Sequence, residues 1–155
     1  MTLAKRANSG DVIWMRRSVA RLENVPSDRA AETKMYSAGV RLIVGRDLQG
    51  NNAPILDVRV SIEIKDSLFE AFFDVKARFV FGGDRKIPEE TELRDFVRDY
   101  GIDYAFGFIR AALADDLRVF GLSPAILPPT ALDDAKASEL TLVHSEDIMS
   151  YEPQA

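Results

Sequence analysis

The stretch that decides the fold runs from Leu56 to Phe81 and reads LDVRVSIEIKDSLFEAFFDVKARFVF. Apolar and polar residues alternate without interruption through Ile64, which is the period-two pattern of a strand with one face in water. A second alternating run begins at Phe69, after the polar turn Lys65-Asp66-Ser67. Because so short a turn separates the two runs, we expect a long antiparallel hairpin.

Two more strands are predicted upstream of this hairpin. Apolar residues recur at every second position from Tyr36 to Val44, which indicates a strand. The segment from Val12 to Glu23 is ambiguous, because its apolar spacing fits a helix while its Val-Ile-Trp run fits an edge strand that ends before Pro26. We interpret this segment as a strand.

Helices are predicted downstream of the hairpin. Pro88 followed by acidic residues is typical of a helix start, and we expect a short helix towards Tyr100 that Gly101 breaks. A long helix then follows, and Gly121 ends it as a C-cap. Its apolar stripe consists of Ile102, Ala105, Phe106, Ile109, Ala112, Leu113, Leu117 and Phe120.

This order of elements predicts an α+β domain with a four-stranded antiparallel sheet followed by a long helix. We expect the domain to span residues 1–129. Residues 130–155 follow Pro128-Pro129 and are rich in Ala, Asp, Glu and Ser. They are predicted to form a loosely attached acidic tail, with a helical stretch over 132–142.

Composition narrows the possible functions. The chain has 155 residues and a net charge of −5, which disfavours nucleic acid as a partner. It contains no cysteine and a single histidine, His144, so we expect neither a metal site nor a cofactor. Arg16 and Arg17 interrupt the first hydrophobic run, which argues against a signal peptide. We therefore expect a cytoplasmic protein with no membrane insertion.

No set of residues predicts catalysis. His144, Ser145 and Glu146 are adjacent in sequence, and neighbours along the chain cannot assemble a catalytic triad. The unusual feature is a set of large apolar residues on faces expected to be polar. They are Ile43, Phe72, Val80, Tyr104 and Phe108. A second layer formed by the tail, an oligomer or a binding groove would each cover them.

One stretch of the long helix resembles a known family. Phe106-Gly107-Phe108-Ile109-Arg110, then Gly121 and Pro124-Ala125-Ile126-Leu127-Pro128, resembles the signature of the SecB family of export chaperones. The resemblance implies a homotetramer, a dimer of dimers, without enzyme activity. It also implies a holdase that binds unfolded preproteins in hydrophobic grooves and passes them to SecA. Gly107 replaces a proline of the signature, and a SecB-like chaperone that protects an antitoxin fits this departure at least as well.

The resemblance also implies roles for particular residues. The client-binding groove would include Tyr36, Val40, Leu42, Val44 and Phe106. The oligomer interface would include Val75, Ile109, Leu113 and Leu117, and SecA docking would use Glu23 and Asp74. No residue is assigned to catalysis or to a metal.

Two other classes of function stay open at this stage. One is an α+β domain that binds a small molecule or acts as a thioesterase-like enzyme, which would need a pocket with convergent polar groups. The other is a structural assembly subunit. On the chaperone interpretation, Leu42→Asp or Val44→Asp is expected to impair client holding while the secondary structure stays intact.

Overall fold

The predicted hairpin forms the centre of a sheet in the computed structural model, which describes residues 2–8, 10–22, 35–47, 52–122, 127 and 129–145. Strand β4 (Pro54–Lys65) pairs antiparallel with β5 (Phe69–Phe81), with Val60 opposite Val75. The turn is closed by the Asp66 amide, which donates to the Phe69 carbonyl at 3.0 Å. The hairpin prediction is confirmed.

The other two predicted strands flank this hairpin. Strand β3 (Met35–Arg46) pairs antiparallel with β4, and β2 (Val12–Arg21) pairs antiparallel with β5 through a bulge near Trp14. The sheet has six strands and not four, because β1 (Ala7–Asn8) also pairs with β5 and β6 (Leu142–His144) runs parallel to β3. The short helix α1 (Leu3–Arg6) precedes β1.

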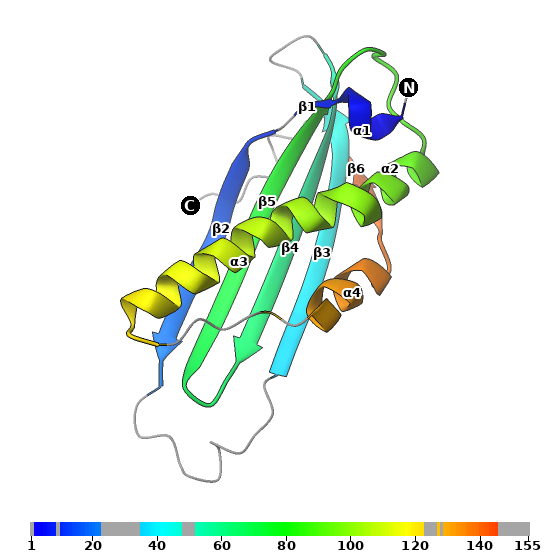
Figure 1. The fold of residues 1–155 in the computed structure, drawn as a ribbon. Coiled ribbons are helices and arrows are strands. Elements are labelled where there is room, and N and C mark those ends of the chain that lie inside the picture. The colour runs from blue at the N-terminus through cyan, green and yellow to red at the C-terminus, as the bar shows by residue number, and fades with distance from the viewer. Residues whose placement is uncertain are drawn as a thin grey trace.

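One continuous helical rod crosses the sheet obliquely (Figure 1). It consists of α2 (Glu90–Phe96), a π-helical turn (Val97–Gly101) and α3 (Ile102–Val119). The predicted break at Gly101 is wrong, since this residue has helical φ and ψ of −63° and −45°. A Cβ here would lie 3.2 Å from the Val58 side chain, so the glycine lets the rod approach the sheet closely.

The end of α3 follows the predicted C-cap. Gly121 has a φ of +72°, a left-handed conformation that favours glycine. Its amide donates to the Arg118 carbonyl at 3.0 Å, and the Leu122 amide donates to the Leu117 carbonyl at 2.9 Å. These two bonds form a Schellman motif, which satisfies carbonyls that the helix end would leave unpaired.

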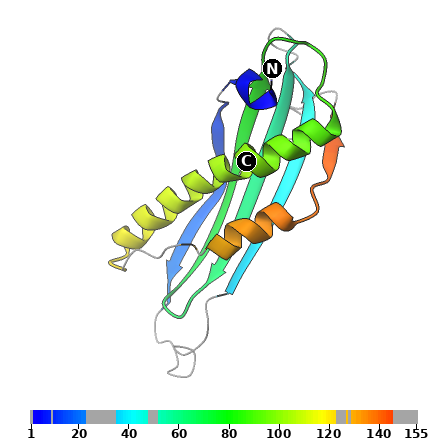
Figure 2. The ribbon, with the colours of Figure 1, turned by 45° about the vertical axis from the view of Figure 1, so that its right-hand side comes forward.

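The core lies between α3 and the sheet face that it covers, which we call the inner face. Here the alternation of β4 and β5 meets the apolar stripe of α3, and each buried Leu, Ile or Phe contributes about 1.5–3 kcal/mol. Its fully buried large side chains include Leu56, Ile62, Ile64, Phe73, Phe81, Phe106, Ile109, Leu113 and Leu117. Figure 2 shows the helices on this one face of the sheet.

The described part of the predicted tail packs onto this domain. Helix α4 (Pro129–Ala137) lies over β3, and β6 extends the sheet beside β3. Ala135 and Leu140 are buried in the core, and Arg94 Nε donates to the Leu140 carbonyl at 3.1 Å. Residues 129–145 are therefore not a loosely attached tail, because their apolar residues complete the inner layer.

Two glycine substitutions should change stability in opposite directions. Gly121→Ala is expected to lower the free energy of unfolding by about 1 kcal/mol, because alanine is strained at a positive φ. Gly107→Ala is expected to raise it by about 0.8 kcal/mol, because Gly107 is exposed within α3 and no atom lies within 4 Å of the added Cβ. Urea unfolding of both variants measures the two effects, and equal signs would contradict this account of the helix end.

Candidate functional site

Four aromatic side chains along the helical rod, here called the ladder, form two ring pairs that Phe79 links. Phe96, Tyr100, Tyr104 and Phe108 are four residues apart. Ring centroids are 5.8 Å apart for Phe96 and Tyr100, and 5.3 Å apart for Tyr104 and Phe108. Phe79 of β5 lies under the ladder, at 5.0 Å from Phe96 and 5.4 Å from Tyr104. These spacings suit tilted and edge-to-face ring contacts.

A π-helical turn lies within the ladder, and Tyr100 is part of it. In a regular α-helix, residues four apart drift around the axis, because one turn holds about 3.6 residues. The π-turn over Val97–Gly101 takes in more residues per turn and so compensates for part of this drift. Single π-turns inside α-helices occur often at functional sites. Exposure rises from the buried Phe96 to Tyr100, which is 54% exposed.

Three ladder residues, Phe96, Tyr100 and Tyr104, form one wall of a groove with a volume of about 670 Å³, and Phe108 continues the ladder beyond it. The facing wall comes from the N-terminal segment, through Ala4 of α1 and Ala7 of β1. The groove is lined by Ala4, Ala7, Phe79, Phe96, Asp99, Tyr100, Asp103 and Tyr104. A second depression of about 370 Å³ adjoins it and shares Ala4, Phe96, Asp99 and Tyr100 as lining residues.

Acidic residues follow the same helical rod. Asp95, Asp99 and Asp103 each precede a ladder aromatic, and Glu92 lies one turn earlier. Like charges four residues apart cost a helix about 0.2–0.5 kcal/mol per pair. Lys136 of α4 offsets Asp103 at 2.9 Å, whereas Asp95 and Asp99 are exposed and make no ion pair with any described residue. The groove therefore has aromatic walls and a negative rim.

The predicted client-groove residues lie elsewhere. Leu42, Val44 and Phe106 are at most 1% exposed inside this chain's own core, and β6 pairs with β3 from Leu42 to Val44. Tyr36 and Val40 are half-buried and pack against the same core. The chain's own α4 and β6 thus occupy the region in which the resemblance implied a groove. In this structure the first three residues are inaccessible to a client.

The predicted oligomer-interface residues are also internal. Val75, Ile109, Leu113 and Leu117 are at most 1% exposed and belong to the contact between α3 and the inner face. They cannot meet a second subunit while this contact holds. The apolar residues that stay exposed near α3 are Phe108, Val119 and Phe120.

Of the two predicted SecA-docking residues, Glu23 lies outside the described residues. Asp74 lies on the face of the sheet opposite α3, where its carboxylate accepts from Arg59 Nε at 2.8 Å and from Arg59 Nη2 at 2.6 Å. These hydrogen bonds raise the pKa of the Arg59 guanidinium, an effect that burial partly opposes. Asp74 is therefore a paired carboxylate.

Sequence reasoning identified Tyr104 and Phe108 as unexpected apolar residues but missed Phe96 and Tyr100. The signal that could have found them is the repeat Asp95-Phe96, Asp99-Tyr100, Asp103-Tyr104. The expected helix break at Gly101 hid this period. His144 is exposed on β6, and the described residues contain no His, Asp and Glu group that could hold a metal ion. None of the described helices is long and apolar enough to span a membrane.

Comparison with known proteins supports the fold. No family model and no curated protein matches the chain. Among solved structures, it is similar to a Mycobacterium tuberculosis SecB-like chaperone in complex with a ChAD peptide from the HigA1 antitoxin. The two are 23% identical, with a TM-score of 0.55 over 81% of this chain and 92% of that chain. The predicted SecB-like α+β fold is confirmed.

The ladder should bind apolar probes. Tyr100→Ser is expected to weaken binding of the neutral dye Nile red about fivefold, because the groove loses aromatic contact worth about 1 kcal/mol. Val119→Ser is the control, since Val119 is 82% exposed and does not line the groove. Dye fluorescence titrations measure both affinities. Equal weakening by the two variants would show that the groove is not the dye site.

Proposed function

We propose that this chain is a holdase chaperone that binds unfolded polypeptides along the aromatic groove. The observation that carries the proposal is a row of accessible rings on a chain with the SecB-like fold. Tyr100 is 54% exposed and Phe108 is 37% exposed, although large aromatic side chains favour burial. A contiguous apolar surface of this kind is typical of an interaction site.

The chemistry of the groove suits many client sequences. Aromatic rings provide large apolar contact area with few rotatable bonds, and they contact apolar side chains without demanding a fixed pattern of hydrogen bonds. The exposed carboxylates of Asp95 and Asp99 on the rim favour clients that carry Lys or Arg near their apolar residues. We therefore propose that the preferred segments are extended, apolar and basic.

We favour a dedicated client, such as an antitoxin, over preprotein export through SecA. The similar Mycobacterium tuberculosis chaperone was solved with an antitoxin peptide, which supports a polypeptide client of this class. Docking of SecA would require accessible acids, whereas Asp74 is bound on both carboxylate oxygens by Arg59. We place this activity in the cytoplasm, as the sequence predicts, and we assign it no catalytic step.

We further propose that the homotetramer expected from the resemblance uses surfaces other than the predicted ones. Val119 and Phe120 lie at the end of α3, away from the groove, and stay 82% and 38% exposed in the single chain. A second copy would bury them, and apolar area removed from water stabilises association by about 25 cal/mol per Å².

The holdase role is tested by the aggregation of chemically denatured citrate synthase after dilution, followed by light scattering. The wild-type chain should suppress aggregation, and Tyr100→Ser/Phe108→Ser should suppress it several-fold less. Both side chains are accessible, so the circular dichroism spectrum should not change. Leu68→Ser is the matched control, because Leu68 is 55% exposed in the β4–β5 turn and does not line the groove. If the double variant suppresses aggregation as well as the wild type does, the groove is not the client site.

The structure changes the expected effect of Leu42→Asp. Leu42 is fully buried, and an unpaired carboxylate in the core costs several kcal/mol, so the variant should lose its cooperative thermal transition. Differential scanning calorimetry measures this. A folded Leu42→Asp variant with a normal transition would mean that the inner face can open at β3.

A further inference from the structure

The face of the sheet opposite α3, here called the outer face, carries a row of cations. Arg41 of β3 lies directly opposite Arg59 of β4, and Arg59 lies directly opposite Lys76 of β5. Of these three cations on neighbouring strands, Lys76 is buried and has a partner of its own, Arg59 is paired with Asp74, and Arg41 is exposed. Like charges directly opposite each other destabilise a sheet, so Arg41 is repelled by Arg59, and the Arg59–Asp74 ion pair offsets part of this repulsion.

The acidic residues next to the row are already engaged. Asp57 accepts from Arg78 Nε at 2.8 Å and from Arg78 Nη2 at 3.0 Å, and Asp74 is held in the same forked geometry by Arg59. Both carboxylates are largely buried, at 3% and 7% exposure. Arg41 is exposed and makes no hydrogen bond or ion pair with any described residue.

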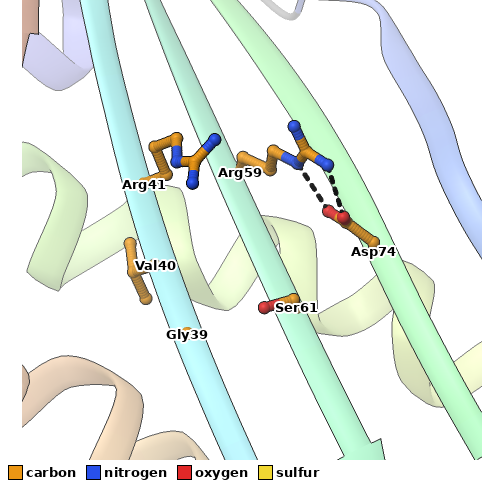
Figure 3. A pocket seen from close by; sticks show the side chains of 6 residues that line it. All are labelled: Gly39, Val40, Arg41, Arg59, Ser61 and Asp74. Atoms are coloured by element: carbon orange, nitrogen blue, oxygen red, sulfur yellow. Dashed lines mark hydrogen bonds and ion pairs between the residues drawn. The ribbon is translucent and has the colours of Figure 1, made fainter. Parts of the chain in front are cut away.

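A hollow of about 180 Å³ lies beside these arginines (Figure 3). Its lining consists of Gly39, Val40, Arg41, Arg59, Ser61 and Asp74. A Cβ on Gly39 would come within 2.9 Å of Ser61 Oγ, so a side chain at this position would fill part of the hollow. Figure 3 shows the Arg41 and Arg59 guanidinium groups on the same side of it.

The donors around the hollow match a carboxylate. Arg59 uses Nε and Nη2 for Asp74, which leaves the N–H groups of Nη1. Arg41 has all its donors available to a partner, and the Ser61 hydroxyl can donate as well. Guanidinium groups are weakly hydrated and bind carboxylates through paired hydrogen bonds, so the site can exchange water for a carboxylate at low cost.

We propose that the outer face is a docking surface for an acidic polypeptide partner, with an Asp or Glu carboxylate seated in the hollow between Arg41 and Arg59. Charge complementarity favours this partner, because the cations Arg41, Arg59, Lys76 and Arg78 share the centre of this face with the acids Asp57 and Asp74, although the chain as a whole carries a net charge of −5. The sign is opposite to that expected for SecA docking. Because the aromatic groove lies on the other side of the sheet, a client and this partner can bind at the same time.

The test uses the full chain and a fluorescein-labelled oligoglutamate peptide, with binding followed by fluorescence anisotropy at low salt. Arg41→Gln is expected to weaken binding about tenfold, the loss of a charged hydrogen-bonded contact. Arg118→Gln should bind as the wild type does, since Arg118 is an exposed cation of α3 on the other side of the sheet. Amide NMR shifts on peptide addition should centre on Gly39, Arg41 and Ser61.

A second measurement separates docking from a structural role. Arg41→Gln should raise the midpoint of thermal unfolding by about 1 °C, because it removes a like charge opposite Arg59. Unchanged peptide affinity in Arg41→Gln, or a lowered midpoint, would overturn the proposal. So would equally tight binding of an oligothymidylate of the same charge, since the surface would then be a general anion site. Binding that requires deletion of residues 146–155 would identify the occupant as the chain's own acidic end.

Discussion

The close contact between the helical rod and the inner face of β4 and β5 determines the rest of the structure. A Cβ added to Gly101 would lie only 3.2 Å from the Val58 side chain, so the glycine allows the rod to pack closely on the sheet. This close packing buries the apolar stripe of α3 in the core. The neighbouring aromatic residues of the rod lie beside the core, where Phe96 and Tyr104 contact Phe79. The same contact therefore produces both the stability of the domain and an accessible aromatic surface.

The sequence predicted the elements whose patterns are local. Strict alternation of apolar and polar residues is enough to predict β4 and β5. A glycine after the apolar stripe is enough to predict that α3 ends near Gly121. It did not predict the continuous rod, because a glycine inside a helix usually signals a break, and here it permits close packing instead. It also did not predict β6, since three residues of edge strand leave almost no periodic signal.

The site was predicted less well than the fold. A resemblance assigns roles to positions along the chain. It does not show which of these positions the chain's own C-terminal segment covers. Leu42 and Val44 lie beneath such a cover, and Val75, Ile109, Leu113 and Leu117 are used for the chain's own core. The aromatic ladder, in contrast, includes a π-helical turn at Tyr100, which no local sequence pattern predicts. Sequence reasoning therefore found large apolar residues outside the core stripe, at Tyr104 and Phe108, but did not predict that the residues assigned to the groove are buried in the single chain.

The short strand β6 has a consequence for the protein's own solubility. The backbone of β3 between Leu42 and Val44 would otherwise present unpaired donors and acceptors at the rim of the sheet, where extended chains can add on. Ser145 continues this protection by donating to the Val44 carbonyl at 2.9 Å. By pairing with β3, the chain's own β6 and Ser145 keep this stretch of the sheet edge from pairing with other extended chains.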